Sequence, residues 1–204
     1  MKVVDNMSVD DQIKRIADST KNILDTINAP DDTKISDIVS YLKHSGYIHI
    51  IDEDSDGYPT DVYMDNMYVI PSHAFYNCRN LAWTSLQDEV TSIDYHAFAG
   101  CYKLALTSLP DGLTSIGQFA FFRCYDITLT ELPGGLKTIR EGAFQYCTGL
   151  TSLTFKGKPN SISSSAFSYC TNLRDIKVPW SNGEVPGAPW GASATITYDY
   201  HPTE

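Results

Sequence analysis

The nine residues Ile93-Asp94-Tyr95-His96-Ala97-Phe98-Ala99-Gly100-Cys101 decide the architecture of this chain, because the chain repeats their pattern. The Ala-Phe pair recurs at residues 74–75, 97–98, 120–121, 143–144 and 166–167. A cysteine follows each pair, at residues 78, 101, 124, 147 and 170. The period is 23 residues throughout. A constant period of about 20–50 residues is typical of a solenoid.

Each repeat has the form Ile-x-x-x-Ala-Phe-x-x-Cys-x-x-Leu and continues into a strand-like segment. One unit has too few apolar side chains to form a core, so equivalent side chains must stack in ladders between units. The first apolar position is occupied by Ile70, Ile93, Ile116, Ile139 and Ile162. The strand-like segments end at Leu86, Leu109, Leu132, Phe155 and Val178. The odd number of cysteines and their shared position predict buried free thiols rather than disulfides or metal ligands.

This unit resembles the BspA-like (Treponema pallidum type) leucine-rich repeat over about residues 66–199. The resemblance implies a right-handed parallel solenoid with one strand per repeat. It also implies binding of a ligand or partner rather than catalysis, often on bacterial surfaces. We therefore expect a leucine-rich-repeat solenoid of parallel β-strands with five 23-residue repeats, behind a small α-helical and hairpin N-terminal module.

The chain is expected to divide into four segments. These are a helical module at residues 1–46, a hairpin or N-terminal cap at 47–69, the repeats at 70–178 and a C-terminal cap at 179–204. Residues 1–69 carry 14 acidic and 6 basic side chains, whereas the remainder carries 11 and 9, which favours a boundary near residue 69. An open solenoid end exposes apolar ladders. Trp180 and Trp190, which lie among prolines, are expected to cover that end of the core. Residues 194–198 can then add a final strand.

Residues 8–28 are predicted to form a helix with a heptad seam. The seam consists of Val9, Ile13, Ile16, Thr20, Ile23 and Ile27. Isoleucine at both seam positions favours assemblies larger than a dimer, so the seam predicts oligomerisation, most simply as a homotrimer. The alternative is a helix that packs on its own domain, with Leu24 widening the apolar face. A second helix is expected from about Thr33 to Gly46. The segment has Ser-Val-Asp-Asp-Gln-Ile at residues 8–13 and Ala-Pro-Asp-Asp-Thr-Lys-Ile-Ser-Asp-Ile at residues 29–38. In this it resembles the N-terminal segment of some tail-associated proteins of phages that infect gut bacteria.

An acidic stretch, Asp52-Glu53-Asp54-Ser55-Asp56-Gly57-Tyr58-Pro59, lies between predicted strands at residues 47–51 and 61–70. Alternating carboxylates followed by glycine match the first half of a calcium loop. Tyr63 stands where such a loop needs a bidentate glutamate, and strands rather than helices flank it. We predict a solvated hairpin loop, with a weak calcium site at Asp52–Asp56 as the alternative.

The sequence predicts no catalytic site, no metal site and no cofactor, because it contains none of the usual hydrolase, zinc-protease or phosphate-loop motifs. His73 and His96 share one repeat position with Phe119, Gly142 and Ser165, so that position is predicted to face solvent. The net charge of −10 argues against nucleic-acid binding. The sequence contains no run of about 18 apolar residues, so it predicts no membrane-spanning helix. The opening residues lack the apolar core of a secretory signal.

The outward face of the strand-like segments is the predicted contact surface. If Leu86 and its equivalents point inward, strand alternation turns two columns outward. One column is Trp83, Leu106, Leu129, Ser152 and Asp175, and the other is Ser85, Ser108, Glu131, Thr154 and Lys177. We predict binding residues Trp83, Leu106, Leu129, Ser85, Glu131, Asp175 and Lys177, since an exposed apolar stripe marks a contact site. In the alternative register, Trp83, Leu106 and Leu129 point inward and the adjacent threonines outward.

The sequence therefore favours a non-enzymatic binding or structural protein. The main hypothesis is a leucine-rich-repeat protein of a phage virion, in the tail or baseplate, that presents a host- or partner-recognition surface. Its partners would be a protein or host-surface glycan and other virion proteins. The alternative is a bacterial BspA-like interaction or adhesion protein, located in the cytoplasm or at the cell surface.

Overall fold

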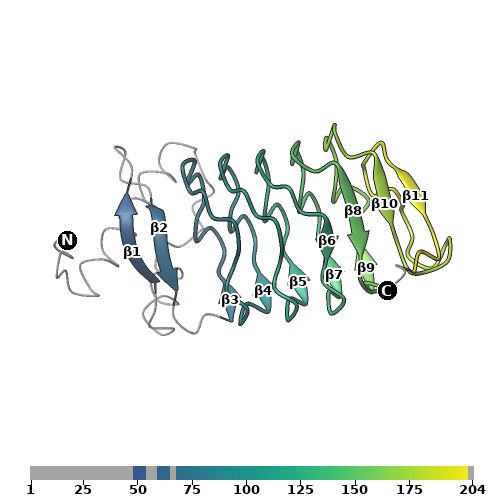
Figure 1. Cartoon of the computed structure of the whole chain (residues 1–204), viewed down its shortest axis with the longest axis horizontal. Helices are drawn as coiled ribbons and strands as arrows, with labels where there is room; N and C mark the ends of the chain where they lie inside the picture. Colours follow the sequence, from purple (N-terminus) through teal and green to yellow (C-terminus); the bar gives the residue numbers. More distant parts are fainter. Residues whose placement is uncertain (1–47, 54–58, 65–67, 202–204) are drawn as a thin grey trace, which may run out of the picture. The chain divides into compact units, whose positions relative to one another are not determined.

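A computed structural model describes residues 48–53, 59–64 and 68–201. The backbone contacts divide the chain into two compact units, residues 1–66 and 67–204. In the first unit, β1 (Ile48–Glu53) and β2 (Pro59–Met64) pair antiparallel (Figure 1). The predicted N-terminal helices, and most of the acidic stretch with its alternative calcium site, lie outside the described residues.

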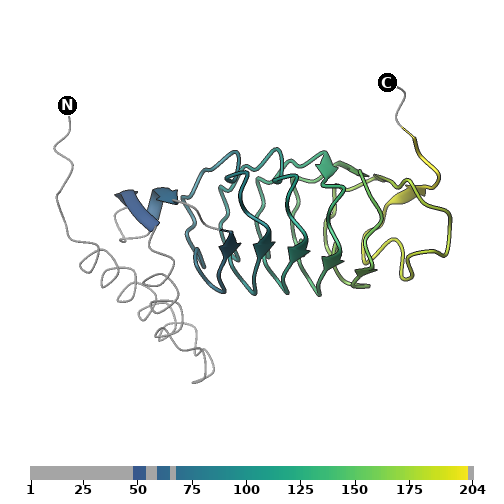
Figure 2. The same ribbon diagram turned by 90° about the horizontal axis from the view of Figure 1, so that it is seen from below.

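The second unit is a parallel solenoid, as the 23-residue period predicts (Figures 1 and 2). Its five-stranded sheet takes one short strand from each repeat. These strands are β3 (Val69–Ile70), β4 (Ser92–Ile93), β5 (Ser115–Ile116), β7 (Thr138–Ile139) and β9 (Ser161–Ile162). The leading isoleucines of neighbouring repeats pair in register along this sheet.

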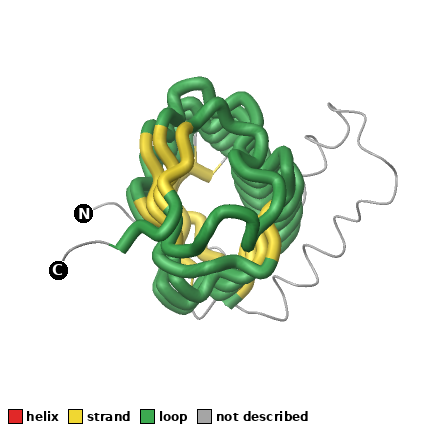
Figure 3. The backbone as a smooth tube through the Cα atoms, turned by 90° about the vertical axis from the view of Figure 1, so that its right-hand side faces the viewer, coloured by secondary structure: helices red, strands yellow, loops and turns green. Residues whose placement is uncertain are grey.

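A second sheet corrects the expectation of a single sheet with one strand per repeat. Its strands are β6 (Glu131–Leu132), β8 (Ser152–Phe155), β10 (Asp175–Lys177) and β11 (Thr195–Thr197). Viewed along the solenoid, the turns lie over one another and the strands gather in separate parts of the coil (Figure 3). The solenoid therefore has two ladders of backbone pairing, of which the leading isoleucines form the longer.

The first two repeats form no strand in the expected segments and the third forms only the two-residue β6, and in these repeats the buried residues do not alternate. Leu106 and Leu109 are both buried although three positions separate them. A strand turns alternate side chains to the same face, so inward residues must be an even number of positions apart. Leu153 and Phe155 satisfy that condition, and both lie in β8.

The Ala-Phe pair forms the centre of the core. The five phenylalanine rings are buried and stack between repeats, with centroids 5.1–5.4 Å apart. The backbone repeats as well: the Phe75 N–H donates to the Ala97 carbonyl at 2.8 Å, and the next three phenylalanines make the equivalent bond. The pair thus supplies both the apolar ladder and a hydrogen bond to the following turn.

The predicted ladder of buried free thiols is confirmed. Four of the five thiols donate a hydrogen bond to a phenylalanine carbonyl of the preceding turn, beginning with Cys101 Sγ to Phe75 O at 2.9 Å. Burial raises the pKa of the thiols of Cys101, Cys124 and Cys147, and raises that of Cys170 to about 12. These cysteines satisfy a backbone acceptor inside the core and remain protonated.

All five thiols should resist alkylation in the native protein, because the reactive species is an exposed thiolate. Maleimide labelling followed by intact-mass measurement should detect no rapid modification until denaturant is added. A Thr151→Cys variant places a thiol at an exposed position and should label at once under the same conditions. Rapid native labelling of the wild-type ladder would contradict the buried arrangement.

The C-terminal end of the core is covered by two buried tryptophans. Trp180 and Trp190 contact the Phe155 ring at centroid distances of 5.3 and 5.7 Å. The Trp190 indole N–H donates to the Pro186 carbonyl at 2.9 Å, and β11 pairs with β10 beyond them.

Among the described residues, no helix has the length and apolar character needed to span a bilayer.

Candidate functional site

The predicted apolar stripe is wrong, and the alternative register is the one observed for its leucines. Leu106 and Leu129 are 0% and 1% exposed. Trp83 is half-buried, with its ring 5.0 Å from that of Phe75. The neighbouring threonines Thr84, Thr107 and Thr130 are exposed instead. The physical reason is a one-residue difference in spacing: five positions separate Cys101 from Leu106, whereas six separate Cys147 from Leu153.

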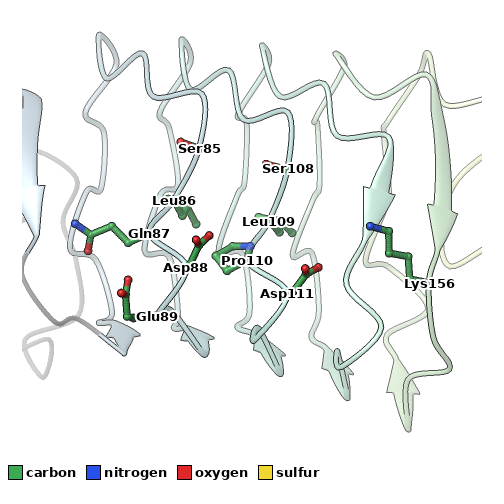
Figure 4. A pocket seen from close by; sticks show the side chains of 10 residues that line it. All are labelled: Ser85, Leu86, Gln87, Asp88, Glu89, Ser108, Leu109, Pro110, Asp111 and Lys156. Atoms are coloured by element: carbon green, nitrogen blue, oxygen red, sulfur yellow. The ribbon is translucent and has the colours of Figure 1, made fainter.

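The second predicted outward column, which starts at Ser85, lies along a groove. This groove is on the side of the solenoid formed by the strand-like segments that end at Leu86 and its equivalents. Ser85, Ser108 and Glu131 are exposed, at equivalent positions of three successive turns. Ser85 and Ser108 line a groove with a volume of about 570 Å³ (Figure 4). Glu131 lines a smaller hollow of about 60 Å³ that shares Ser108 with the groove. We call this combined surface the strand-side groove.

The turns that follow the strand-like segments supply the rest of the groove. Leu86, Leu109 and Pro110 form its apolar floor. Gln87, Asp88, Glu89, Asp111 and Lys156 contribute polar groups (Figure 4). These residues lie here because the chain leaves the core after Leu86 and Leu109 and returns to it at Val90 and Leu113, just before the next β-strand. The groove therefore combines a narrow apolar floor with carboxylate and hydroxyl walls.

An ion pair with Glu131 holds the positively charged end of Lys156 at the groove. Lys156 Nζ lies 2.7 Å from Glu131 Oε2, and about half of each side chain is exposed. The hydrogen bond from Lys156 to Glu131 and the charge of Glu131, with a contribution from Asp111, raise the pKa of Lys156. Both groups are solvated, so the pair orients side chains more than it stabilises the fold. Asp88, Glu89 and Asp111 leave the N-terminal part of the groove acidic.

Asp88, Asp111 and Lys156 line the groove although the sequence did not predict them as binding residues. The signal available was the 23-residue spacing of Asp88 and Asp111, which puts two carboxylates at one position of adjacent turns. Lys156 could not be found in that way, because its position is occupied by proline in the two preceding repeats. It contacts Glu131 only because the turns stack.

The remaining predicted binding residues lie away from the groove. Asp175 is exposed on β10, and Lys177 on the same strand is half-buried with Nζ 4.8 Å from the Tyr200 ring centroid. The predicted oligomerisation residues Val9, Ile13, Ile16, Ile23 and Ile27 lie outside the described residues. Some of the predicted binding residues therefore line the groove and others do not, and the oligomerisation residues stay a prediction.

The histidine position differs from the prediction that it faces solvent. His73 is buried and His96 half-buried, with ring centroids 5.3 Å apart, and Tyr95 stacks on His96 at 4.1 Å. Burial lowers the pKa of each histidine to about 4, so both are neutral at neutral pH. Both adopt left-handed backbone angles, as does Phe119 in the next repeat. The position belongs to a turn that directs rings onto the neighbouring repeat.

The described residues contain no cluster of three or more histidine, cysteine, aspartate or glutamate side chains placed to bind a metal ion. The rings of His73 and His96 contact each other across neighbouring turns, and His96 contacts Phe119 of the next turn. Of the surfaces described, the strand-side groove best combines concavity, exposed polar groups and an apolar floor, which are the features of a binding site.

The repeat that builds this groove matches a known family. The family of BspA type leucine rich repeat regions matches residues 68–188 in six copies. The chain belongs to the BspA-type leucine-rich repeat family. This BspA-type solenoid carries its groove over the first repeats that the family match covers. A comparison with curated proteins finds no match.

Two solved structures of leucine-rich repeat proteins are similar to this BspA-type chain. One, from Bacteroides ovatus, is 33% identical over 54% of this chain and 28% of its own length, with a TM-score of 0.45. The other, from T. pallidum, is 27% identical over 65% of this chain and 69% of its own, with a TM-score of 0.46. The match therefore spans little more than a quarter of the Bacteroides ovatus protein.

Proposed function

We propose that this chain is a non-enzymatic protein-binding module and that the strand-side groove is its contact face. The observation that carries the proposal is the groove itself, which extends over successive turns and is walled by exposed side chains at equivalent repeat positions. Membership of a leucine-rich repeat family supports it, because such solenoids use extended surfaces to bind partners.

The lining of the groove favours a protein over a glycan. A strip of Leu86, Leu109 and Pro110 surrounded by carboxylates and hydroxyls resembles the apolar centre and polar rim of protein interfaces. Among the described residues that line the groove, none is aromatic, so no ring offers a face on which a sugar could stack. An excess of acidic groups would favour a partner surface with basic side chains.

The biological setting that we propose is a bacterial interaction or adhesion protein, acting in the cell or at its surface. The family match supports the interaction or adhesion role, and the location is part of the proposal. The phage-virion hypothesis rests on the N-terminal segment, which lies outside the described residues, and none of the comparisons supports it. Oligomerisation through residues 8–28 likewise remains a prediction.

Site-specific crosslinking should identify the partner. A photoreactive amino acid at Ser108 would lie in the groove, and the same group at Ser161 would lie exposed on the five-stranded sheet as a matched control. We expect one defined protein to be crosslinked from Ser108 and not from Ser161 when the chain is exposed to extract from the source organism or its host.

The crosslinked protein, once purified, should bind the unmodified chain, and Asp111→Lys should weaken that binding about tenfold or more by reversing a charge in the groove. Asp126→Lys makes the same change at an exposed position outside the groove and should leave the affinity unchanged. Equal crosslinking from Ser108 and Ser161, or equal effects of the two charge reversals, would overturn the assignment of the groove.

A further inference from the structure

We propose that Asn182 is a site of spontaneous chemical modification, at which its side-chain amide becomes a carboxylate through a cyclic imide with the backbone nitrogen of Gly183. The pair lies in the segment between β10 and β11 that also carries the two capping tryptophans. Neither the repeat nor the strand-side groove uses it.

The local geometry leaves both reacting groups accessible. Residues 181–184 form a turn in which the Glu184 N–H donates to the Ser181 carbonyl at 3.2 Å. The Ser181 N–H in turn donates to Glu184 Oε1 at 2.8 Å. Asn182 and Gly183 at the tip are exposed, and a Cβ placed on Gly183 would meet no atom within 4 Å. The Asn182 side chain is therefore open to solvent, and the space around the Gly183 Cα is free of other side chains.

The chemistry needs only water and a base. Hydroxide removes the proton from the Gly183 nitrogen, whose electron pair attacks Cγ of Asn182. A nitrogen–carbon bond forms, the Cγ–Nδ2 bond breaks, and the leaving group takes up a proton and departs as ammonia. Water then opens the imide at one carbonyl or the other, which yields aspartate or isoaspartate at position 182. No oxidation or reduction occurs, and the need for a deprotonated nitrogen makes the reaction faster at higher pH.

The structure separates Asn182 from the other described asparagines. At those sites the following backbone nitrogen already donates a hydrogen bond: Cys78 to Phe75 O (3.2 Å), Leu81 to Cys78 O (3.1 Å), Ser161 to Lys137 O (3.2 Å) and Leu173 to Cys170 O (3.0 Å). The Gly183 N–H donates to no atom among the described residues. Attack at any of the other sites must first break a backbone hydrogen bond and must bring a bulkier residue into the ring.

Modification would change the turn in two ways. It adds a carboxylate beside Glu184, whose Oε2 lies 2.6 Å from Lys158 Nζ. The isoaspartate product also adds a methylene group to the backbone inside the turn that the Ser181–Glu184 hydrogen bonds close. We therefore expect the Lys158–Glu184 pair and this loop of the cap to loosen while the repeats remain folded.

Incubation of the full chain at neutral and mildly alkaline pH, followed by peptide mapping with mass spectrometry, tests the proposal. Replacement of the side-chain NH₂ by OH should appear at Asn182 about tenfold or more faster than at Asn160 or Asn172, since the latter lose a hydrogen bond on reaction. The rate should rise with pH, and isoaspartate should be found at position 182.

Two variants complete the test. Asn182→Ser should abolish the early release of ammonia, and Asn160→Ser should leave it unchanged. Conversion at Asn182 no faster than at Asn160, or a rate independent of pH, would overturn the proposal. Peptide mapping of unfolded protein gives the reference rate for each asparagine, so that the effect of the fold is separated from the effect of the following residue.

Discussion

Replacing Phe121 with alanine should lower the free energy of unfolding by about 3–5 kcal/mol, as expected for removal of a fully buried ring. The Phe121 side chain is 0% exposed, and the rings of Phe98 and Phe144 stack on its two faces at 5.4 and 5.2 Å. Truncation leaves a cavity in the middle of the ladder, so it weakens two interfaces between turns. Urea unfolding followed by circular dichroism measures the change.

Tyr169→Ala is the matched control for this prediction. Tyr169 also stacks on the equivalent ring of the preceding turn, Tyr146 at 4.6 Å, but it is 58% exposed. Its removal should cost about 1 kcal/mol or less, because it loses a ring contact without opening a buried cavity. If the two variants lost equal stability, ring stacking alone would account for the stability of the ladder, and burial of the phenylalanines would not be its cause.

Replacing Trp190 with alanine should destabilise the protein by a similar amount, about 3–5 kcal/mol. Trp190 is 0% exposed and contacts Phe155 and Trp180, so it is the main side chain covering the last turn of the core. Its loss should also expose the end of the ladder, and limited proteolysis should then cleave the cap before the repeats.

Trp190→Phe separates packing from hydrogen bonding at this site. Phenylalanine keeps an aromatic ring but cannot donate to the Pro186 carbonyl, so the expected loss is only about 1–2 kcal/mol. A Trp190→Ala variant within about 1 kcal/mol of the wild type would show that the cap does not depend on this residue. The same unfolding assay reads both variants.

The ladders of the fold could be predicted from the sequence because each depends on one residue type at one repeat position. The leading isoleucines, the phenylalanines and the cysteines each occupy equivalent places in successive turns, as the period requires. Stacking makes these contacts a direct function of residue number. Trp180 and Trp190 could be placed at the end of the core as well, because only large side chains can cover the last phenylalanine.

The contact surface could not be predicted in the same way, because strand alternation fails in the first three repeats. Leu129 and Leu132 both point inward, so the two residues between them are both exposed. A rule of period two that is anchored on Leu132 places two of these four residues, Leu129 and Thr130, on the wrong side. The groove additionally depends on turns whose residues differ between repeats, and on the contact of Lys156 with Glu131 in the preceding turn. Such pairs follow from three-dimensional stacking and have no sequence pattern.

The uniform pairing of the leading isoleucines has an evolutionary consequence. Ile93 pairs with Ile70 on one side and Ile116 on the other, and Ile139 meets its two neighbours in the same register. Because each junction along this ladder pairs isoleucine with isoleucine in the same register, recombination within the gene could duplicate or delete a whole repeat without disturbing the ladder. The strand-side position of Ser85, Ser108 and Glu131 can meanwhile diversify by point substitution. The number of repeats, and with it the length of the solenoid, can therefore evolve separately from the residues that line the groove.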